Sequence, residues 1–157
     1  MIDLVKSATE RDLVITIICG GGSALFTRPA EGVSIERLAE VRMHLLNSGA
    51  SIGEINTVYK HLSAVHGGQL GLSAFPATVI TLAVSDVPED DHFVIASGPT
   101  IYDTTTIDDA KTVAAKYALR ELPFIETPGY GPLAPQLKFT FASVRVNAAA
   151  VDGNVFV

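Results

Sequence analysis

A short apolar strand that runs almost directly into a glycine turn is the feature that most restricts how this chain can fold. Residues Leu13–Ile18 are apolar or β-branched throughout, and Gly20–Ser23 follow after a single cysteine. A strand with apolar side chains on both faces is typical of a parallel sheet that is covered on both sides. We therefore expect a buried parallel strand that carries a glycine turn at its carboxyl end.

The rest of the hydrophobic pattern alternates between helical and strand periodicity. It places helices at residues 34–47, 51–66 and about 107–119. It places strands at residues 13–18, 77–84 and, more weakly, 137–146. Gly67-Gly68 is expected to break or kink the second helix before residues 70–75, and Asp152-Gly153 has the sequence of a hairpin turn. This order predicts an open α/β layer architecture.

Composition excludes several classes of protein. A chain of 157 residues suits one domain, and its net charge of −6, without a cluster of Lys and Arg, argues against nucleic acid as a partner. The longest apolar run is far shorter than the ~20 residues of a membrane helix, and the N-terminus does not resemble a signal peptide. The single Cys19 cannot form an internal disulfide. We expect a soluble cytoplasmic protein with no membrane contact.

The glycine turn is the first candidate site. Glycines permit a sharp turn and let a ligand approach main-chain N–H groups, as phosphates and nucleotides do at the carboxyl ends of parallel strands. The spacing fits neither the P-loop nor the dinucleotide fingerprint. A tight turn without a ligand is therefore an equally good interpretation of these glycines alone.

A polar helix face is the second candidate. Asn56, Lys60 and Ser63 stand at i, i+4 and i+7 of the predicted second helix, so they would share one face, and a lysine above a glycine pair suits a phosphate. A solvated polar face is the more common meaning of such a pattern. His61 and His66 are five residues apart and would not share a face, which argues against a metal pair.

Two loops supply the remaining candidates. Ser85-Asp86 ends the second predicted strand, and Asp90 and Asp91 follow it. Carboxylates at a strand end suit magnesium, which binds one or two carboxylates together with nucleotide phosphates. An acidic turn exposed to water is the alternative. The loop Ser97–Thr100 then offers hydroxyls and a rigid turn.

The amino-acid sequences of these segments resemble those of one known family. The chain contains, in order, ICGGGSALFTRPAEGVS, LLNSGASIGEINTVYKHLSAVHGGQL, LAVSDVPEDDHFVIASGPTIYD and AKYAL. Over roughly residues 13–125 these segments resemble the amino-terminal domain of the glycerate 2-kinase family. Some members of that family are labelled hydroxypyruvate reductases. The resemblance implies a two-lobed α/β enzyme whose first lobe has a Rossmann-like sheet. It also implies transfer of the γ-phosphoryl group of ATP to D-glycerate with a divalent metal, giving 2-phosphoglycerate and ADP.

The resemblance also assigns site residues and cofactors. It implies catalytic roles for Lys60 and Asp86, and magnesium ligation by Asp86 and Asp90. It implies contacts with substrate or nucleotide for Gly20, Gly21, Gly22, Ser23, Asn56, Ser85, Ser97, Gly98 and Thr100. The expected cofactors are ATP and Mg²⁺.

The sequence departs from the family at five positions. The family usually has serine where Cys19 stands and glycine where Glu89 stands. It has basic residues where Tyr59 and His66 stand, and often arginine where Gln69 stands. Three positions have therefore lost full positive charge, which weakens a phosphate site.

The length departs from the family as well, so we expect an α/β domain that is incomplete relative to the family. We expect residues 1–135 to form a partial amino-terminal-type domain and residues 136–157 to be a divergent tail. An incomplete α/β layer exposes apolar surface, and so we expect a homodimer built on either the tail or the sheet edge.

Two other functions compete with kinase activity. The lost basic residues favour a non-catalytic binding or scaffold domain that kept the fold. A hydroxypyruvate reductase is disfavoured, because no dinucleotide fingerprint with a following ribose-binding acid is present.

Overall fold

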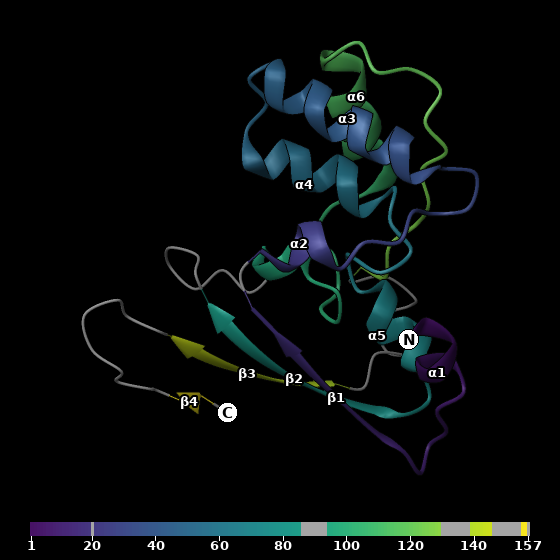
Figure 1. Cartoon of the computed structure of the whole chain (residues 1–157), viewed down its shortest axis with the longest axis vertical. Coiled ribbons are helices and arrows are strands. Elements are labelled where there is room, and N and C mark those ends of the chain that lie inside the picture. The colour runs from purple at the N-terminus through teal and green to yellow at the C-terminus, as the bar shows by residue number, and fades with distance from the viewer. Residues whose placement is uncertain (20, 86–93, 130–138, 146–154, 157) are drawn as a thin grey trace.

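The computed structural model describes residues 1–19, 21–85, 94–129, 139–145 and 155–156. In chain order the elements are α1 (Ile2–Lys6), β1 (Leu13–Ile18), α2 (Gly22–Leu25), α3 (Ile35–Asn47), α4 (Ile52–Lys60), α5 (Gln69–Ala74), β2 (Thr78–Ser85), the 3₁₀ turn η2 (Ile95–Ser97), α6 (Ile107–Lys116), β3 (Phe139–Arg145) and β4 (Val155–Phe156). Figure 1 shows the sheet on one side of the molecule and the cluster of α3, α4 and α6 on the other. Among the described residues no helix is both long and apolar enough to cross a membrane.

The described strands form one sheet in the order β1-β2-β3-β4, with β1 at an edge. β1 pairs with β2 in parallel, from Leu13 opposite Thr78 to Ile18 opposite Ala83. β3 continues the parallel sheet on the other side of β2, and β4 lies antiparallel to β3. The predicted α/β class and the weak strand at 137–146 are confirmed, while the predicted hairpin turn at Asp152-Gly153 lies outside the described residues.

Capping side chains fix where the helices α3 and α4 of the helical cluster begin. The Ser34 hydroxyl accepts the Arg37 N–H at the start of α3, and Ser51 forms a reciprocal capping box with Glu54 at the start of α4. The two helices pack through a mainly apolar contact, to which α6 adds Val113. Its buried members are Leu38, Val41, Leu45, Ile55, Val58, Tyr59 and Leu62.

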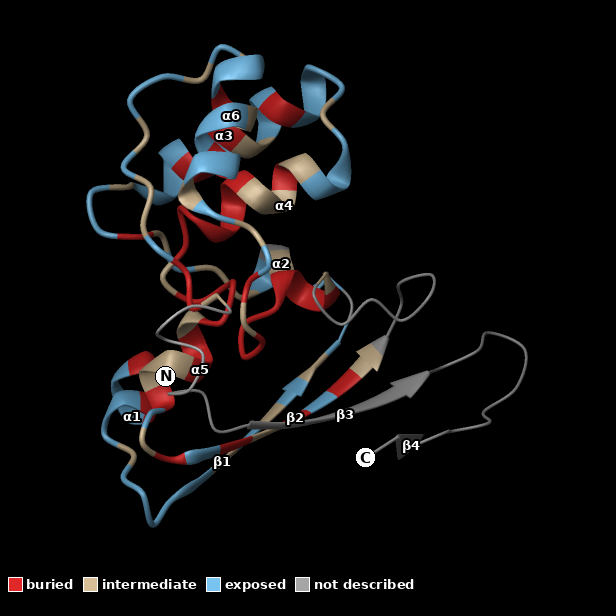
Figure 2. Cartoon of the chain, turned by 180° about the vertical axis from the view of Figure 1, so that it is seen from behind, coloured by how far each residue is buried: buried red, intermediate tan, exposed pale blue. Residues whose placement is uncertain are grey.

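A second, smaller core joins the sheet to the helices near the N-terminus. Val5 of α1, Leu70 and Ala74 of α5 and Val79 of β2 pack together, with Phe26 against them. Figure 2 shows that the described helices lie on one side of the sheet only. The carboxyl ends of β1 and β2 lie beneath α2 (Figure 1).

The expectation that β1 is buried on both faces is wrong for the described structure. Leu13, Ile15 and Ile17 are 55%, 57% and 77% exposed, and Leu82, opposite Ile17 in β2, is 39% exposed. The physical reason is that the described helices cover only the opposite face, which carries Val79. One face of an apolar strand is thus left in water.

The second predicted helix is also shorter than expected, because it ends at Lys60 instead of reaching the glycine pair. The following residues turn away and pair with an earlier segment. The Ala30 N–H donates to the Leu62 carbonyl (2.9 Å) and the Ala64 N–H donates to the Arg28 carbonyl (2.8 Å). This tertiary pairing takes Ser63 off the helix, so Ser63 does not share a helix face with Asn56 and Lys60.

Candidate functional site

Three of the predicted binding residues meet in a small hydroxyl cluster. Ser23 follows the glycine turn, Asn56 lies on α4 and Ser97 ends η2. The hydroxyl oxygens of Ser23 and Ser97 are 2.9 Å apart, and the Ser97 hydroxyl donates to the Asn56 side-chain oxygen at 3.3 Å. Ser97 is fully buried, whereas Ser23 and Asn56 are partly exposed. The cluster therefore has a buried end and an end that a ligand can reach.

The glycine turn has structural reasons for its composition. Gly21 has a φ of 77°, which favours glycine. A side chain at Gly22 would place its Cβ 2.8 Å from the Cβ of Ala96, so glycine is needed for α2 to approach η2. These constraints fit the tight-turn interpretation, and ligand binding by Gly21 and Gly22 stays a prediction. Gly20 lies outside the described residues.

The turn that carries Ser97 has an unusual backbone. Ala96, Ser97 and Gly98 all have positive φ values, of 49°, 59° and 59°. Non-glycine residues in this region cost free energy and gather at functional sites. The glycine pair holds the turn in place, because the Gly67 N–H donates to the Ser97 carbonyl (3.0 Å) and the Gly68 N–H donates to the Gly98 carbonyl (2.7 Å).

Lys60 is buried, which corrects the expectation of a solvated polar face. It is 5% exposed, and its Nζ lies 3.2 Å from Oδ1 of Asp103, which is 1% exposed. The same oxygen accepts hydrogen bonds from the N–H and the hydroxyl of Thr105. The ammonium is thus tied to a carboxylate behind the hydroxyl cluster. Direct catalysis by Lys60 stays a prediction, and its position in this structure is a supporting one.

Asp103 is the polar residue that the sequence analysis missed. Its second oxygen, Oδ2, has no hydrogen-bond partner among the described residues and lies 3.8 Å from Nε2 of His61. A Cβ on Gly67 would stand 3.1 Å from that oxygen, so the buried pair packs directly against the glycine pair. The Asp-x-Thr spacing was the available signal, since aspartate commonly accepts from a main-chain N–H two residues later.

His66 is a neutral group in the same region. It is fully buried, its Nδ1 is 2.8 Å from the Ser63 hydroxyl, and its Nε2 has no partner among the described residues. Its ring packs 5.2 Å from the Tyr59 ring between centroids. Burial, with smaller contributions from the charges of Arg42 and Lys60, lowers the pKa of His66 to about 4. His66 therefore supplies no positive charge to a phosphate at neutral pH.

Thr100 does not join the hydroxyl cluster. It is fully buried, and its hydroxyl lies 2.7 Å from that of Thr81, which in turn lies 2.8 Å from the hydroxyl of Thr16. This chain of hydroxyls ties the loop to the two strands. The structure places Thr100 beneath the site, and Gly98 within the strained turn.

The acidic candidates cannot be placed. Asp86, Asp90 and Asp91 lie outside the described residues, and for Ser85 only its place at the end of β2 is described. Within the described ranges no three His, Cys, Asp or Glu side chains come together in a group able to hold a metal ion. Magnesium ligation therefore stays a prediction from the sequence.

With this geometry in view, comparison with known proteins gives the family. Residues 1–124 match the family described as a domain of unknown function (DUF4147). The chain belongs to this family. A division of the chain at residue 135 stays a prediction, and β3, from beyond that point, is part of the same sheet.

Similar proteins carry kinase and reductase names. The chain is 49% identical over 119 residues to D-glycerate 2-kinase from Thermotoga maritima, covering 76% of this chain and 28% of that protein. It is 44% identical over 156 residues to a putative hydroxypyruvate reductase from Agrobacterium vitis, covering 93% and 35%. The crystal structure of glycerate kinase from Thermotoga maritima matches with a TM-score of 0.83 and 41% identity, over 90% of this chain and 34% of that one. The resemblance to glycerate 2-kinases is confirmed, and the chain spans about a third of the length of these relatives.

Removing one partner of the buried ion pair should destabilise the fold strongly. Asp103→Asn leaves the Lys60 ammonium buried without a counter-charge, and we expect a loss of about 3–5 kcal/mol in the free energy of unfolding by urea. Asp108→Asn, in an exposed pair with Lys111, is the matched control and should cost at most about 1 kcal/mol. Equal losses for the two variants would contradict this role for Asp103.

His66 should make the fold sensitive to acid. The unfolded chain binds a proton at His66 near pH 6.5 and the folded chain only near pH 4, so stability falls as pH drops through this window. The expected loss is about 3 kcal/mol across the window. His66→Gln should remove this part of the pH dependence of urea unfolding, whereas His44→Gln should leave it. An unchanged pH dependence in His66→Gln would show that the imidazole is not buried in its neutral form.

Proposed function

We propose that this chain is a glycerate-kinase-type domain that binds ATP and D-glycerate and supports phosphoryl transfer to the 2-hydroxyl, giving 2-phosphoglycerate and ADP. The observation that carries the proposal is the meeting of Ser23, Asn56 and Ser97 beside the glycine turn, in a chain 49% identical to a named D-glycerate 2-kinase. Phosphoryl transfer requires chiefly positioning and neutralisation of charge. The hydroxyls of Ser23 and Ser97 and the amide of Asn56 would provide the positioning.

In this proposal each group has a defined task. Ser23 and Asn56 orient the ligand, while Ser97 and Gly98 fix their geometry through the strained turn. Magnesium would shield the negative charge of the polyphosphate, and the sequence assigns Asp86 and Asp90 to hold it. Lys60 positions the site through its contact with Asp103.

A non-catalytic binding domain is the second candidate. It is favoured by the pairing of Lys60 with Asp103 and by the neutral state of His66, because both reduce the positive charge available to a transferring phosphoryl group. The reductase name of some relatives receives no support from the glycine turn, whose spacing does not match a dinucleotide fingerprint.

We expect the 157-residue chain to bind ligand but to turn over weakly or not at all, since it spans about a third of its relatives' length. The measurement is ATP- and Mg²⁺-dependent formation of 2-phosphoglycerate, with calorimetric binding of ATP and D-glycerate alongside. Turnover in the ordinary kinase range of ~1–100 s⁻¹ would contradict the expectation of weak activity.

Variants separate the two candidates. Asn56→Ala should lower both binding and any turnover, whereas Thr57→Ala, on the same helix with its hydroxyl on the Gly53 carbonyl, should leave both unchanged. Specific binding with no product would favour the binding domain. If a folded chain shows neither binding nor product, the kinase proposal is overturned. If that chain oxidises NADH in the presence of hydroxypyruvate, reductase activity replaces kinase activity as the proposed function.

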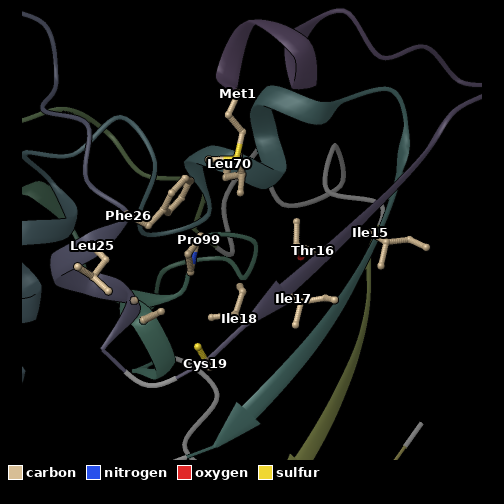
Figure 3. A pocket seen from close by; sticks show the side chains of 12 residues that line it. Met1, Ile15, Thr16, Ile17, Ile18, Cys19, Leu25, Phe26, Leu70 and Pro99 are labelled. Atoms are coloured by element: carbon tan, nitrogen blue, oxygen red, sulfur yellow. The ribbon is translucent and has the colours of Figure 1, made fainter.

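We further propose that the protein is a cytoplasmic homodimer that buries the exposed face of β1. Ile15 and Ile17 are 57% and 77% exposed there. A hollow of about 400 Å³ lies along the same strand, and its lining includes Phe26 and Leu70 from the helix-covered side (Figure 3). Contiguous apolar patches on soluble proteins mark interfaces, and unpaired edge strands invite pairing. A single free cysteine fits a reducing compartment.

Light scattering coupled to size exclusion should therefore give about twice the monomer mass of 16.6 kDa. Ile17→Lys should shift the protein to monomer. Ile52→Lys should not, because Ile52, which is 66% exposed against 77% for Ile17, stands at the start of α4. Point variants are preferable to deletion of residues 137–157, because that deletion would remove β3 from the sheet. A clean monomer for the unmodified chain would refute the dimer.

A further inference from the structure

A second hollow shares no lining residue with the apolar one beside β1. It has a volume of about 430 Å³ and opens between α3 and α4, which lie side by side above α2 (Figure 1). Its walls are mainly apolar, with two hydroxyls and one charged side chain. The lining residues are Thr27, Ile35, Leu38, Ala39, Arg42 and Tyr59.

Arg42 is the one charged residue among those that line this hollow. Its guanidinium carbon lies 5.4 Å from the centroid of the Tyr59 ring, a cation–π geometry that fixes the charge on a buried aromatic surface. Arg42 forms no ion pair with any described residue. By contrast, Arg37 on the same helix pairs with Glu40, and Lys60 pairs with Asp103. Among the described residues, Arg42 thus lines the hollow as a cation that is stacked on Tyr59 and has no ion-pair partner.

Hydrogen bonds connect the hollow to the hydroxyl cluster through a single residue. The Tyr59 hydroxyl donates to the Ser23 carbonyl at 3.1 Å, and the Thr27 hydroxyl donates to the same carbonyl at 3.0 Å. The two hydroxyl oxygens are 2.7 Å apart. The hydroxyl of Ser23 meets Ser97 instead. Ser23 therefore stands between the Arg42 hollow and the Ser97 cluster. Its carbonyl is bound by residues that line the hollow, and its hydroxyl contacts Ser97.

We propose that this hollow is the carboxylate subsite for a small 2-hydroxy acid, with the Arg42 guanidinium as the group that binds the carboxylate. The planar guanidinium matches a carboxylate with two parallel hydrogen bonds, and the apolar walls strengthen that contact by excluding water. In a 2-hydroxy acid the carboxylate and the reacting hydroxyl are on adjacent carbons, so their subsites must adjoin. Ser23 provides that adjacency.

This inference rests on the proposed function for the identity of the acid, and it adds the residue that selects for an acid. Apolar walls and a single cation suit one carboxylate better than a heavily hydrated triphosphate. A hollow that recognised the nucleotide would be expected to offer several cations or main-chain donors, and Arg42 is the sole charged group on these walls.

The test is a titration of the ¹⁵N-labelled full chain with D-glycerate, followed at the Ser23 and Thr27 amides. Arg42→Gln keeps the stem against Tyr59 and removes the charge, and we expect it to weaken D-glycerate binding by about tenfold or more. Arg37→Gln should bind as the unmodified chain does. Arg42→Lys should recover part of the affinity, and an unchanged spectrum elsewhere shows that each variant is folded.

The outcomes distinguish this subsite from the kinase proposal. Equal D-glycerate affinity in Arg42→Gln and Arg37→Gln would overturn the subsite and leave the kinase proposal standing. Binding of D-lactate, but not D-glycerate, through Arg42 would support the subsite and remove glycerate as substrate. Loss of ATP affinity alone in Arg42→Gln, or no response of the Thr27 amide to either acid, would also overturn the subsite. Should Arg42→Gln fail to fold, Arg42→Lys and Thr27→Val carry the same comparison.

Discussion

The strained turn at Ala96–Gly98 is the constraint on which the rest of the site depends. Left-handed backbone costs about 1–3 kcal/mol at a residue with a side chain, and here two such residues stand in succession. The main-chain donors of Gly67 and Gly68 offset that cost. A Cβ at Gly68 would stand 2.6 Å from the Pro128 ring, and Gly67, with a φ of 58°, would place a Cβ 3.0 Å from the Thr127 side chain. The position of the Ser97 hydroxyl is thus a consequence of backbone geometry around two glycines.

Behind this turn lies a layer of buried polar side chains that sets the electrostatics of the site. The charge of Lys60 is compensated by Asp103, and His66 is held neutral by burial. The layer therefore braces the glycine pair without adding net charge to the hydroxyl cluster. Arg42 stacks on Tyr59 and lines the hollow between α3 and α4. The buried layer thus carries little net charge, and in the subsite proposed above Arg42 would supply the cation that meets the carboxylate.

Features encoded over short stretches of sequence could be predicted, and those decided by distant contacts could not. The starts of α3 and α4 follow from the caps Ser34 and Ser51, and β1 and β2 follow from β-branched runs. The predicted end of α4 was wrong, because the helix ends where the chain pairs with a segment about thirty residues earlier. The burial of Lys60 depends on Asp103, 43 residues away. The resemblance indicates Ser23, Asn56 and Ser97 one by one, but neither their meeting nor the strained backbone of the turn could be predicted.

The exposed face of β1 bears on the site as well as on assembly. Its isoleucines and leucine are spaced as in a strand covered on both faces, yet the described helices cover one. β1 leads within three residues into Gly21–Ser23, whose hydroxyl and carbonyl connect the cluster to the Arg42 hollow. Any polypeptide that packs on this face would restrict β1 and hence the turn that follows it. The dimer proposed above would therefore pack on the same strand that leads into the proposed ligand site.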